Sequence, residues 1–168
     1  PGFHAFNLLV HLATTGMVYL LARHFGQLHR PDHDWRAVAL LTAICFGLHP
    51  AHTEAITYVS GRATSLMTLA YLAALYAYAR GWQVRALLAF VLAVLVKESA
   101  MLLPLTLLAW EALTGGKLRR IVQRQWPWWL LVALAVAALL AHPGYRSLVG
   151  NSLQVREPVS AVLTQLHA

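Results

Sequence analysis

The sequence predicts an all-α fold, a polytopic bundle of transmembrane helices with about six spans and the start of a seventh. Hydrophobic residues make up 59% of the 168 residues and only 11% are charged, against roughly a quarter in soluble domains. The apolar residues fall into runs separated by short polar segments, as membrane spans do. The basic residues concentrate in alternate polar segments, which is typical of multi-pass membrane proteins.

Composition also excludes several functions. The net charge of +7 would suit a nucleic-acid binder, but the basic residues are spread over separate segments and form no basic stripe. We therefore expect a lipid bilayer as partner and no nucleic acid. The single cysteine, Cys45, permits no internal disulfide and no cysteine-based metal site. Because the chain opens with Pro1 and not with methionine, we expect a fragment, with residues 1–168 forming one transmembrane domain.

The first span is predicted over residues 3–23, which is about the ~20 residues needed to cross a bilayer. His4, Asn7 and His11 interrupt it at helical spacing and share one face. Lipid cannot satisfy these groups, so we expect this face to point into the bundle. Residues 24–35 contain glycine, proline and charged residues, and they are predicted to form a polar loop.

Five further spans follow. All six cover residues 3–23, 36–48, 64–80, 84–97, 99–113 and 127–142. The fourth and fifth belong to one apolar segment that Lys97 and Glu98 interrupt. A charged residue at mid-bilayer costs roughly 2.5–3.5 kcal/mol, so we predict two helices that meet at a polar corner. Gly115 follows the fifth span and terminates its helix, because glycine favours a helix terminus.

A basic segment and three tryptophans mark the start of the sixth span. Residues 115–125 are predicted to form a basic loop, and the tryptophans between 126 and 129 an interfacial belt. After a polar segment, apolar residues recur at helical spacing from Pro158, and proline suits a first helical turn. Residues 158–168 are therefore interpreted as the start of a seventh helix.

The six spans assign the basic residues to two sides of the membrane. Nine of the thirteen fall on one side: Arg23, Arg30, Arg36, Arg80, Arg85, Lys117, Arg119, Arg120 and Arg124. The other side has Arg62, Lys97, Arg146 and Arg156. By the positive-inside rule the first side is cytoplasmic. The second side is then extracytoplasmic.

Polar residues from distant parts of the sequence converge on the extracytoplasmic side. The densest group is the stretch 49–62, and ionisable groups beside hydrocarbon are expensive enough to indicate a functional site. The predicted lining residues are His4, Asn7, His11, His49, His52, Glu54 and Glu98. The predicted phosphate-binding cations are Arg62, Lys97 and Arg146, since such cations bind phosphate through charge-assisted hydrogen bonds. The set suits an enzyme that uses a lipid-linked phosphate donor at the outer face.

Three alternatives remain open at this point. The stretch 49–62 would also be explained by a polar loop that only caps two helices. A transporter or channel would use the intramembrane lysine, glutamate and histidines to relay ions. A metal site would use His49, His52 and Glu54, but ligands on one helical face need i, i+4 spacing, and we predict no metal.

Four short motifs form a specific combination. They are His-Pro-x-His-Thr-Glu-Ala at 49–55, Ser-Gly-Arg-Ala at 60–63, Lys-Glu-Ser-Ala at 97–100 and Leu-Leu-Pro-Leu at 102–105. Together they resemble the transmembrane region of the protein O-mannosyltransferases that carry tetratricopeptide repeats. The helix that opens at Gly2 is similar to the helix that follows the first outer loop in that family.

The resemblance implies a membrane glycosyltransferase of the GT-C type. Such an enzyme takes a sugar, here mannose, from a polyprenyl-phosphate donor and inverts the anomeric carbon. The acceptor is a serine or threonine hydroxyl of an extracytoplasmic protein, and no cofactor is implied. Thr64 departs from the pattern, since the family usually has aspartate there. A hydroxyl cannot replace a carboxylate as base or ion partner.

The resemblance also implies where the catalytic base lies. In the family it is an acidic residue in the first outer loop, before the helix that opens here at Phe3, so we expect it upstream of Pro1. Within the chain, Glu54 and Glu98 are the fallback candidates.

Overall fold

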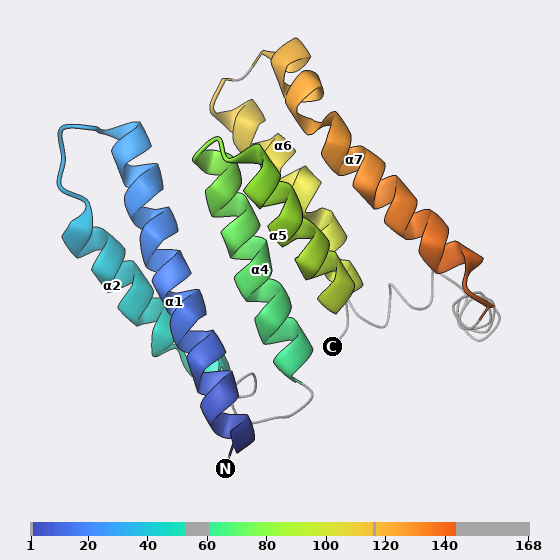
Figure 1. Ribbon diagram of the computed structural model, residues 1–168. Helices are drawn as coiled ribbons and strands as arrows, with labels where there is room; N and C mark the ends of the chain where they lie inside the picture. Colours follow the sequence, from blue (N-terminus) through green and yellow to red (C-terminus); the bar gives the residue numbers. More distant parts are fainter. Residues whose placement is uncertain (1, 53–60, 116, 144–168) are drawn as a thin grey trace, which may run out of the picture. The chain divides into compact units, whose positions relative to one another are not determined.

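The computed structural model describes residues 2–52, 61–115 and 117–143, and every regular element in these ranges is helical, which confirms the predicted class. The α-helices are α1 (Gly2–His29), α2 (Arg36–Gly47), α4 (Arg62–Ala79), α5 (Gln83–Val96), α6 (Leu103–Leu113) and α7 (Leu118–Ala141) (Figure 1). Two 3₁₀ turns, η1 (Pro50–His52) and η3 (Glu98–Leu102), follow α2 and α5. The chain divides into two compact units, Pro1–Gln125 and Trp126–Ala168.

Two helices in the described ranges are long and apolar enough to cross a membrane, His4–His29 and Arg119–Ala141. Arg36–Gly47 and Gln83–Val96 are shorter apolar helices. Helix length and composition thus support membrane insertion. The count of about six spans stays a prediction.

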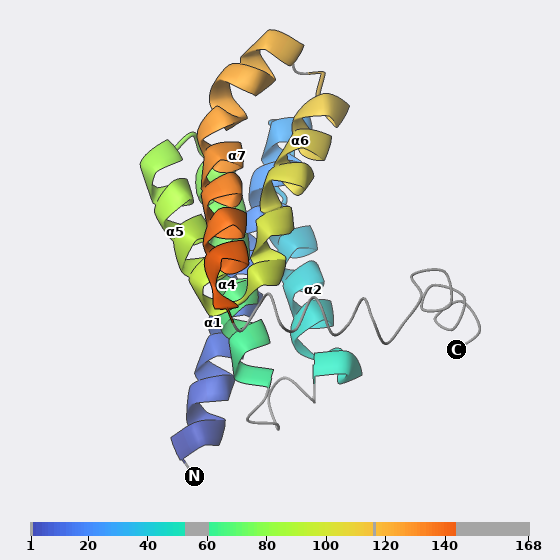
Figure 2. The ribbon, with the colours of Figure 1, turned by 90° about the vertical axis from the view of Figure 1, so that its right-hand side faces the viewer.

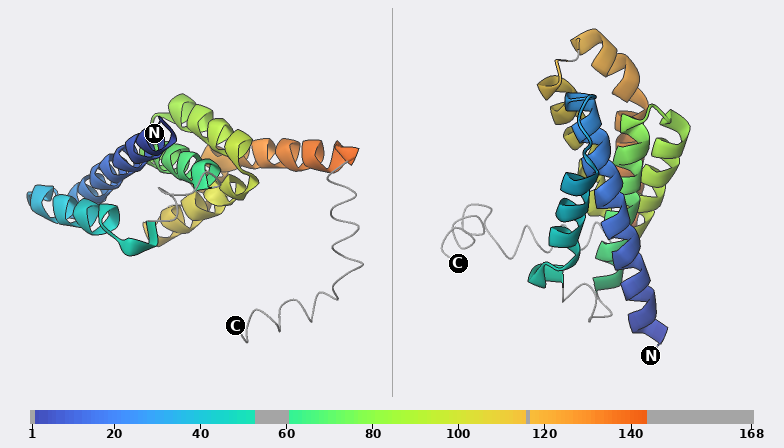
Figure 3. Two further views of the ribbon diagram at one scale, coloured as in Figure 1. Left: turned by 90° about the horizontal axis from the view of Figure 1, so that it is seen from below. Right: turned by 90° about the vertical axis from the view of Figure 1, so that its left-hand side faces the viewer.

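In the first unit, successive helices run in opposite directions. α4 lies between α1 and α5, and α1 also packs against α2 (Figures 1 and 3). α6 starts beside the end of α5, where η3 joins the two (Figure 2). Because the directions alternate, the loops before α2, α5 and α7 lie at one end of the unit. The segments after α2 and α5 lie at the opposite end (Figure 1).

Small side chains make the helix contacts, while large apolar side chains point outward. Alanines of α2, α4 and α5 are at most 6% exposed: Ala39, Ala43, Ala74, Ala77, Ala86 and Ala93. On α5 the opposite face presents Val84, Leu88, Leu92 and Leu95, which are 59–78% exposed. Small residues allow helix backbones to approach closely in membranes, and an exposed leucine stripe marks a surface meant for an apolar environment. The packing therefore fits a lipid-facing helix bundle.

A glycine forms the tight turn between α4 and α5. Gly81 has φ +79°, a conformation that other residues rarely adopt. The backbone N–H groups of Trp82 and Gly81 donate to the carbonyls of Ala77 and Tyr78 at 2.8 and 2.9 Å. This is the Schellman arrangement that satisfies the last carbonyls of a helix. It reverses the chain and places α5 directly on α4.

Two loop predictions are wrong. Residues 24–29 belong to α1, which continues to His29 because no proline lies within Gly2–His29, and Pro31 then restricts the residue before it. Residues 118–125 are the first turns of α7, and Pro127 lies inside this helix rather than at its start. Polar and basic residues at a helix end do not terminate a helix by themselves, since arginine has high helix propensity.

Candidate functional site

The segments that the sequence assigns to the extracytoplasmic side meet at one end of the first unit. The start of α1, the end of α2, the start of α4 and the turn η3 all lie there (Figure 1). This end is opposite the one that receives the predicted cytoplasmic loops. Helix direction therefore brings several of the predicted site residues to a common end.

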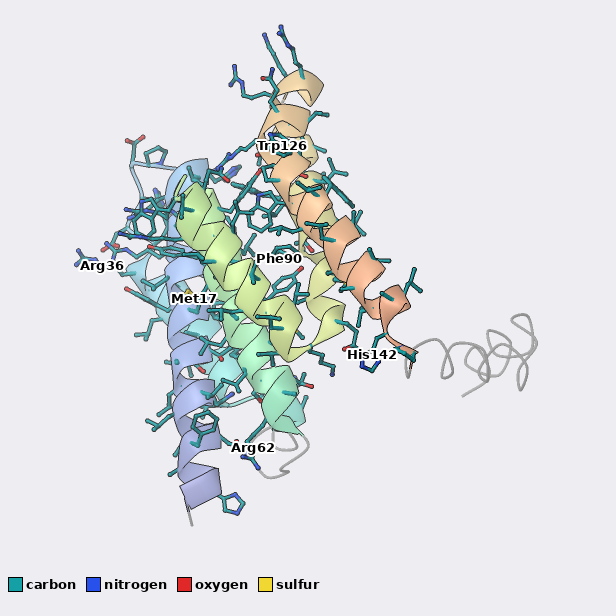
Figure 4. The ribbon with its side chains drawn as sticks, turned by 45° about the vertical axis from the view of Figure 1, so that its right-hand side comes forward. Met17, Arg36, Arg62, Phe90, Trp126 and His142 are labelled. Carbon is teal, nitrogen blue, oxygen red and sulfur yellow. The ribbon has the colours of Figure 1, made fainter. Side chains whose placement is uncertain are left out.

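A lysine connects one sequence motif to the residue that follows another at this end. Lys97 interrupts the α5–η3–α6 segment in an extended conformation, with φ −158° and ψ 131°. Its half-buried side chain reaches α4, where Nζ donates a hydrogen bond of 2.9 Å to Oγ1 of Thr64. Arg62, also half-buried, is the first residue of the same helix (Figure 4). The contact brings the segment that follows Ser-Gly-Arg-Ala next to Lys-Glu-Ser-Ala.

The polar face of α1 is only partly turned inward. Asn7 is 3% exposed. One turn later, His11 Nε2 lies 3.0 Å from the carbonyl oxygen of Gly47, and its ring stacks on Phe46 with centroids 6.0 Å apart. His4 is exposed, so the inward face begins at Asn7. His11 thereby ties α1 to the end of α2, immediately before the His-Pro motif.

The His-Pro motif itself starts with a short capped turn. His49 is exposed, and its Nδ1 accepts a hydrogen bond of 3.2 Å from the backbone N–H of Ala51. Pro50 opens the single 3₁₀ turn η1. Glu98 is exposed at the start of η3, the turn that follows Lys97. These residues are accessible from the same end as Lys97.

Some predicted site residues lie outside the described residues. They are Glu54 and Arg146, together with the side chain of His52. Among residues 2–52, 61–115 and 117–143, no three histidine, cysteine, aspartate or glutamate side chains lie close enough to share a metal ion. Because Glu54 is outside those ranges, the alternative metal site from the sequence stays untested.

A buried polar network at the opposite end was missed by sequence reasoning. Glu111 of α6 is 8% exposed and accepts hydrogen bonds from the Tyr78 hydroxyl at 2.7 Å and from Arg124 Nη1 at 3.2 Å. Gln125 Nε2 donates to the other carboxylate oxygen at 3.2 Å. Arg124 also donates to the Tyr78 carbonyl at 2.7 Å, and the amide of Gln83, turned so that its oxygen faces the guanidinium, accepts from Arg124 Nε.

This network, the Glu111 network, connects α4, α5, α6 and the start of α7. The Arg124 guanidinium lies 4.0 Å from the centroid of the Tyr78 ring, so the cation also contacts the aromatic face. Its paired charges and buried donors fit a structural role. The available signal was the acidic Glu111 in an apolar run, since such a residue is rare without a partner.

Comparisons with known proteins agree with the sequence motifs. The chain is 31% identical over 103 residues to a protein O-mannosyl-transferase of Caenorhabditis elegans, a match that covers 60% of this chain and 14% of the relative. It is 35% identical over 79 residues to protein O-mannosyl-transferase Tmtc1 of Drosophila melanogaster, covering 47% of this chain and 8% of the relative. The human protein O-mannosyl-transferase TMTC4 matches at 34% over 88 residues, covering 49% and 12%.

The chain is thus partially homologous to these protein O-mannosyl-transferases, consistent with a fragment of that family. The matched segments span only 8–14% of these relatives. No family model matches the chain. No solved structure matches it either.

Proposed function

We propose that this chain is part of a multi-pass membrane glycosyltransferase that moves mannose from a polyprenyl-phosphate donor to serine or threonine of an extracytoplasmic protein. The observation that carries the proposal is the Lys97–Thr64 contact. It joins the Lys-Glu-Ser-Ala motif to the residue that follows the Ser-Gly-Arg-Ala motif, on the helix that Arg62 opens and at the end away from most of the basic residues. The partial homology to protein O-mannosyl-transferases supports the reaction class.

The reaction is a single displacement with inversion. The acceptor hydroxyl oxygen forms a bond to the anomeric carbon, and the bond from that carbon to the phosphate oxygen breaks. The electron pair of the broken bond stays on the polyprenyl phosphate, which leaves with an added negative charge. Lys97, Arg62 and Arg146 are the proposed cations that stabilise this charge as it develops. The acceptor proton passes to a base, expected upstream of Pro1, with Glu54 and Glu98 as fallbacks.

Thr64 gives Lys97 an uncharged partner. A hydroxyl holds the ammonium in place through one hydrogen bond of 2.9 Å but does not neutralise it. An aspartate at this position would form an ion pair and compete with the donor phosphate for the lysine. The threonine therefore leaves the positive charge of Lys97 available to an anionic substrate.

Donor binding by Lys97 and Arg62 variants tests the proposal. The full-length protein that contains this chain is purified in detergent. Its affinity for a polyprenyl-phosphate mannose is measured, and so is its rate of sugar transfer to an acceptor peptide. Lys97→Ala and Arg62→Ala should each weaken donor binding by about 10-fold or more, since a charge-assisted hydrogen bond contributes roughly 1.5–3 kcal/mol. Arg62→Lys should rescue only partly, because lysine lacks the bidentate fork.

Lys117→Ala is the matched control, because it removes one exposed positive charge from the opposite end. Its donor affinity should stay within about 2-fold of the parent protein. Unchanged donor binding in both Lys97→Ala and Arg62→Ala would remove these residues from the site. Ion flux through reconstituted protein without any donor turnover would favour the transporter alternative.

A further inference from the structure

A polar pocket lies between α1 and α4, at the end with the predicted cytoplasmic loops. Its volume is about 160 Å³, and its lining comprises Leu20, Arg23, His24, Gln27, Tyr76 and Arg80. The two helices pack along each other, so the pocket is formed by elements of a single compact unit. None of its residues takes part in the proposed glycosyl transfer. We call it the α1–α4 pocket.

Two arginines, Arg23 of α1 and Arg80 at the C-cap of α4, give the α1–α4 pocket its charge. In the part of the chain that the structure describes, the guanidinium groups of Arg23 and Arg80 form no hydrogen bond and no ion pair. No acidic side chain lines the pocket. Two permanent positive charges that face one pocket repel each other, so an anion between them would stabilise the arrangement.

Aromatic rings hold one of these arginines in place. The Arg80 guanidinium carbon lies 6.0 Å from the ring centroid of Tyr76 and 5.2 Å from that of Trp82. Attraction to the ring faces restrains the Arg80 side chain, and the N–H groups of a guanidinium lie along the edges of its plane. The edge is the part that recognises phosphate in a bidentate manner.

A histidine adds a hydrogen-bonding atom that has no partner. Nε2 of His24 is shielded from solvent and makes no hydrogen bond within the described ranges. The ring contacts Tyr76 edge to face, with centroids 5.8 Å apart, which fixes its orientation. A buried polar atom without a partner is unfavourable. An oxyanion in the pocket would accept a hydrogen bond from the protonated Nε2 and satisfy it.

We propose that the α1–α4 pocket binds the phosphate group of an anionic phospholipid. Arginine pairs with phosphate oxygens, and basic pockets between transmembrane helices on the cytoplasmic side suit anionic headgroups. Leu20 is apolar and 38% exposed beside the charged residues, as an acyl chain below a headgroup would require. Free inorganic phosphate carries the same chemical group, but it would make no use of this apolar wall.

Lipid binding by charge-matched variants tests this site. The full-length protein is purified in detergent, and retention of dioleoyl-phosphatidylglycerol is measured by native mass spectrometry. Zwitterionic phosphatidylcholine and inorganic phosphate are measured in parallel. Arg23→Gln/Arg80→Gln should weaken phosphatidylglycerol binding about 30-fold, because each arginine near a membrane surface contributes about 5-fold, or roughly 1 kcal/mol. Arg30→Gln/Arg119→Gln removes the same charge from exposed positions outside the pocket and should weaken it less than about 3-fold.

Further measurements distinguish a lipid phosphate from a free phosphate ion, and a specific loss of binding from a loss of folding. Preferential retention of phosphatidylglycerol over phosphatidylcholine, with no competition by inorganic phosphate, assigns the site to a lipid. Competition by inorganic phosphate supports the same phosphate site and assigns it to a free anion. Arg23→Lys/Arg80→Lys keeps the charge and the fold, and should give intermediate binding. Equal weakening in both glutamine pairs, or binding of neither phosphate form to the parent protein, would overturn the proposal.

Discussion

The Glu111 network offers a direct measurement of what one buried carboxylate contributes to the fold. Replacing Glu111 with alanine removes the carboxylate that accepts hydrogen bonds from the Tyr78 hydroxyl and the Gln125 amide, and these residues are 0% and 1% exposed. Losing a hydrogen bond at a buried donor costs about 1–3 kcal/mol. Arg124 loses its ion pair, but its side chain is 33% exposed and keeps the Tyr78 carbonyl. The lost Arg124–Glu111 ion pair therefore contributes less than about 1 kcal/mol to the decrease in stability.

The expected loss for Glu111→Ala is therefore about 3–5 kcal/mol, the range seen when one member of a buried pair is removed. Glu111→Gln keeps an acceptor for Tyr78 and should cost about 1–2 kcal/mol. Glu98→Ala is the control, since Glu98 is an exposed acid at the opposite end, and should stay within about 0.5 kcal/mol. The free energy of unfolding is measured by SDS titration in mixed micelles, with helicity followed by circular dichroism.

Equal free energies of unfolding for Glu111→Ala and Glu98→Ala would refute the reasoning. A double-mutant cycle with Arg124→Gln supplies the coupling energy directly, because the two side chains are in contact at 3.2 Å. It should lie between about 0.5 and 1 kcal/mol, in line with the partial exposure of Arg124. A coupling energy near zero would show that the arginine is held by its other partners alone.

Two further predictions concern the helix hairpin at the N-terminus and the sidedness of the chain. Gly26→Ala should lower the free energy of unfolding by about 1–3 kcal/mol, because the added methyl would overlap the indole ring of Trp35. Gly16→Ala is the control, since its added methyl meets nothing within 4 Å, and it should be neutral or stabilising. Both are measured in the same SDS titration. In a cysteine-free background, a single cysteine at Thr57 should react with an impermeant thiol reagent from outside intact cells, and one at Gln123 should not. The reason is the charge distribution, which predicts that residue 123 is on the cytoplasmic side. Labelling at position 123 but not at position 57 would invert the predicted topology.

Helix existence was predictable from the sequence, whereas several helix ends were not. The apolar runs are long enough to specify their helices, and Gly81 supplies an unambiguous turn. The end of α1 was misplaced because polar side chains were interpreted as a loop signal, although no proline lies between Gly2 and Pro31. At α7, the basic residues before the tryptophans were predicted to form a loop, but they already form helical turns.

Contacts between distant residues depend on helix register, which the sequence pattern does not supply. The hydroxyl of Thr64 and the ammonium of Lys97 belong to different helices, and only their assembly brings the two atoms to 2.9 Å. The same holds for Tyr78 and Glu111. The sequence could mark each of these residues as costly in a membrane, and therefore as one that needs a partner. It could not say which partner that is.

The interruption at Lys97 has a consequence for the bilayer around the protein. α5 has 14 residues and α6 has 11, so they rise about 21 Å and 16 Å, against a hydrocarbon core of ~30 Å. On the proposed topology both are short at the extracytoplasmic end, and this hydrophobic mismatch is relieved when the outer leaflet thins locally. Such a depression would lower the headgroup layer toward Lys97. A lipid-anchored phosphate could then reach the lysine while its polyprenyl chain stays in hydrocarbon, and thin membranes would favour this encounter over thick, sterol-rich ones.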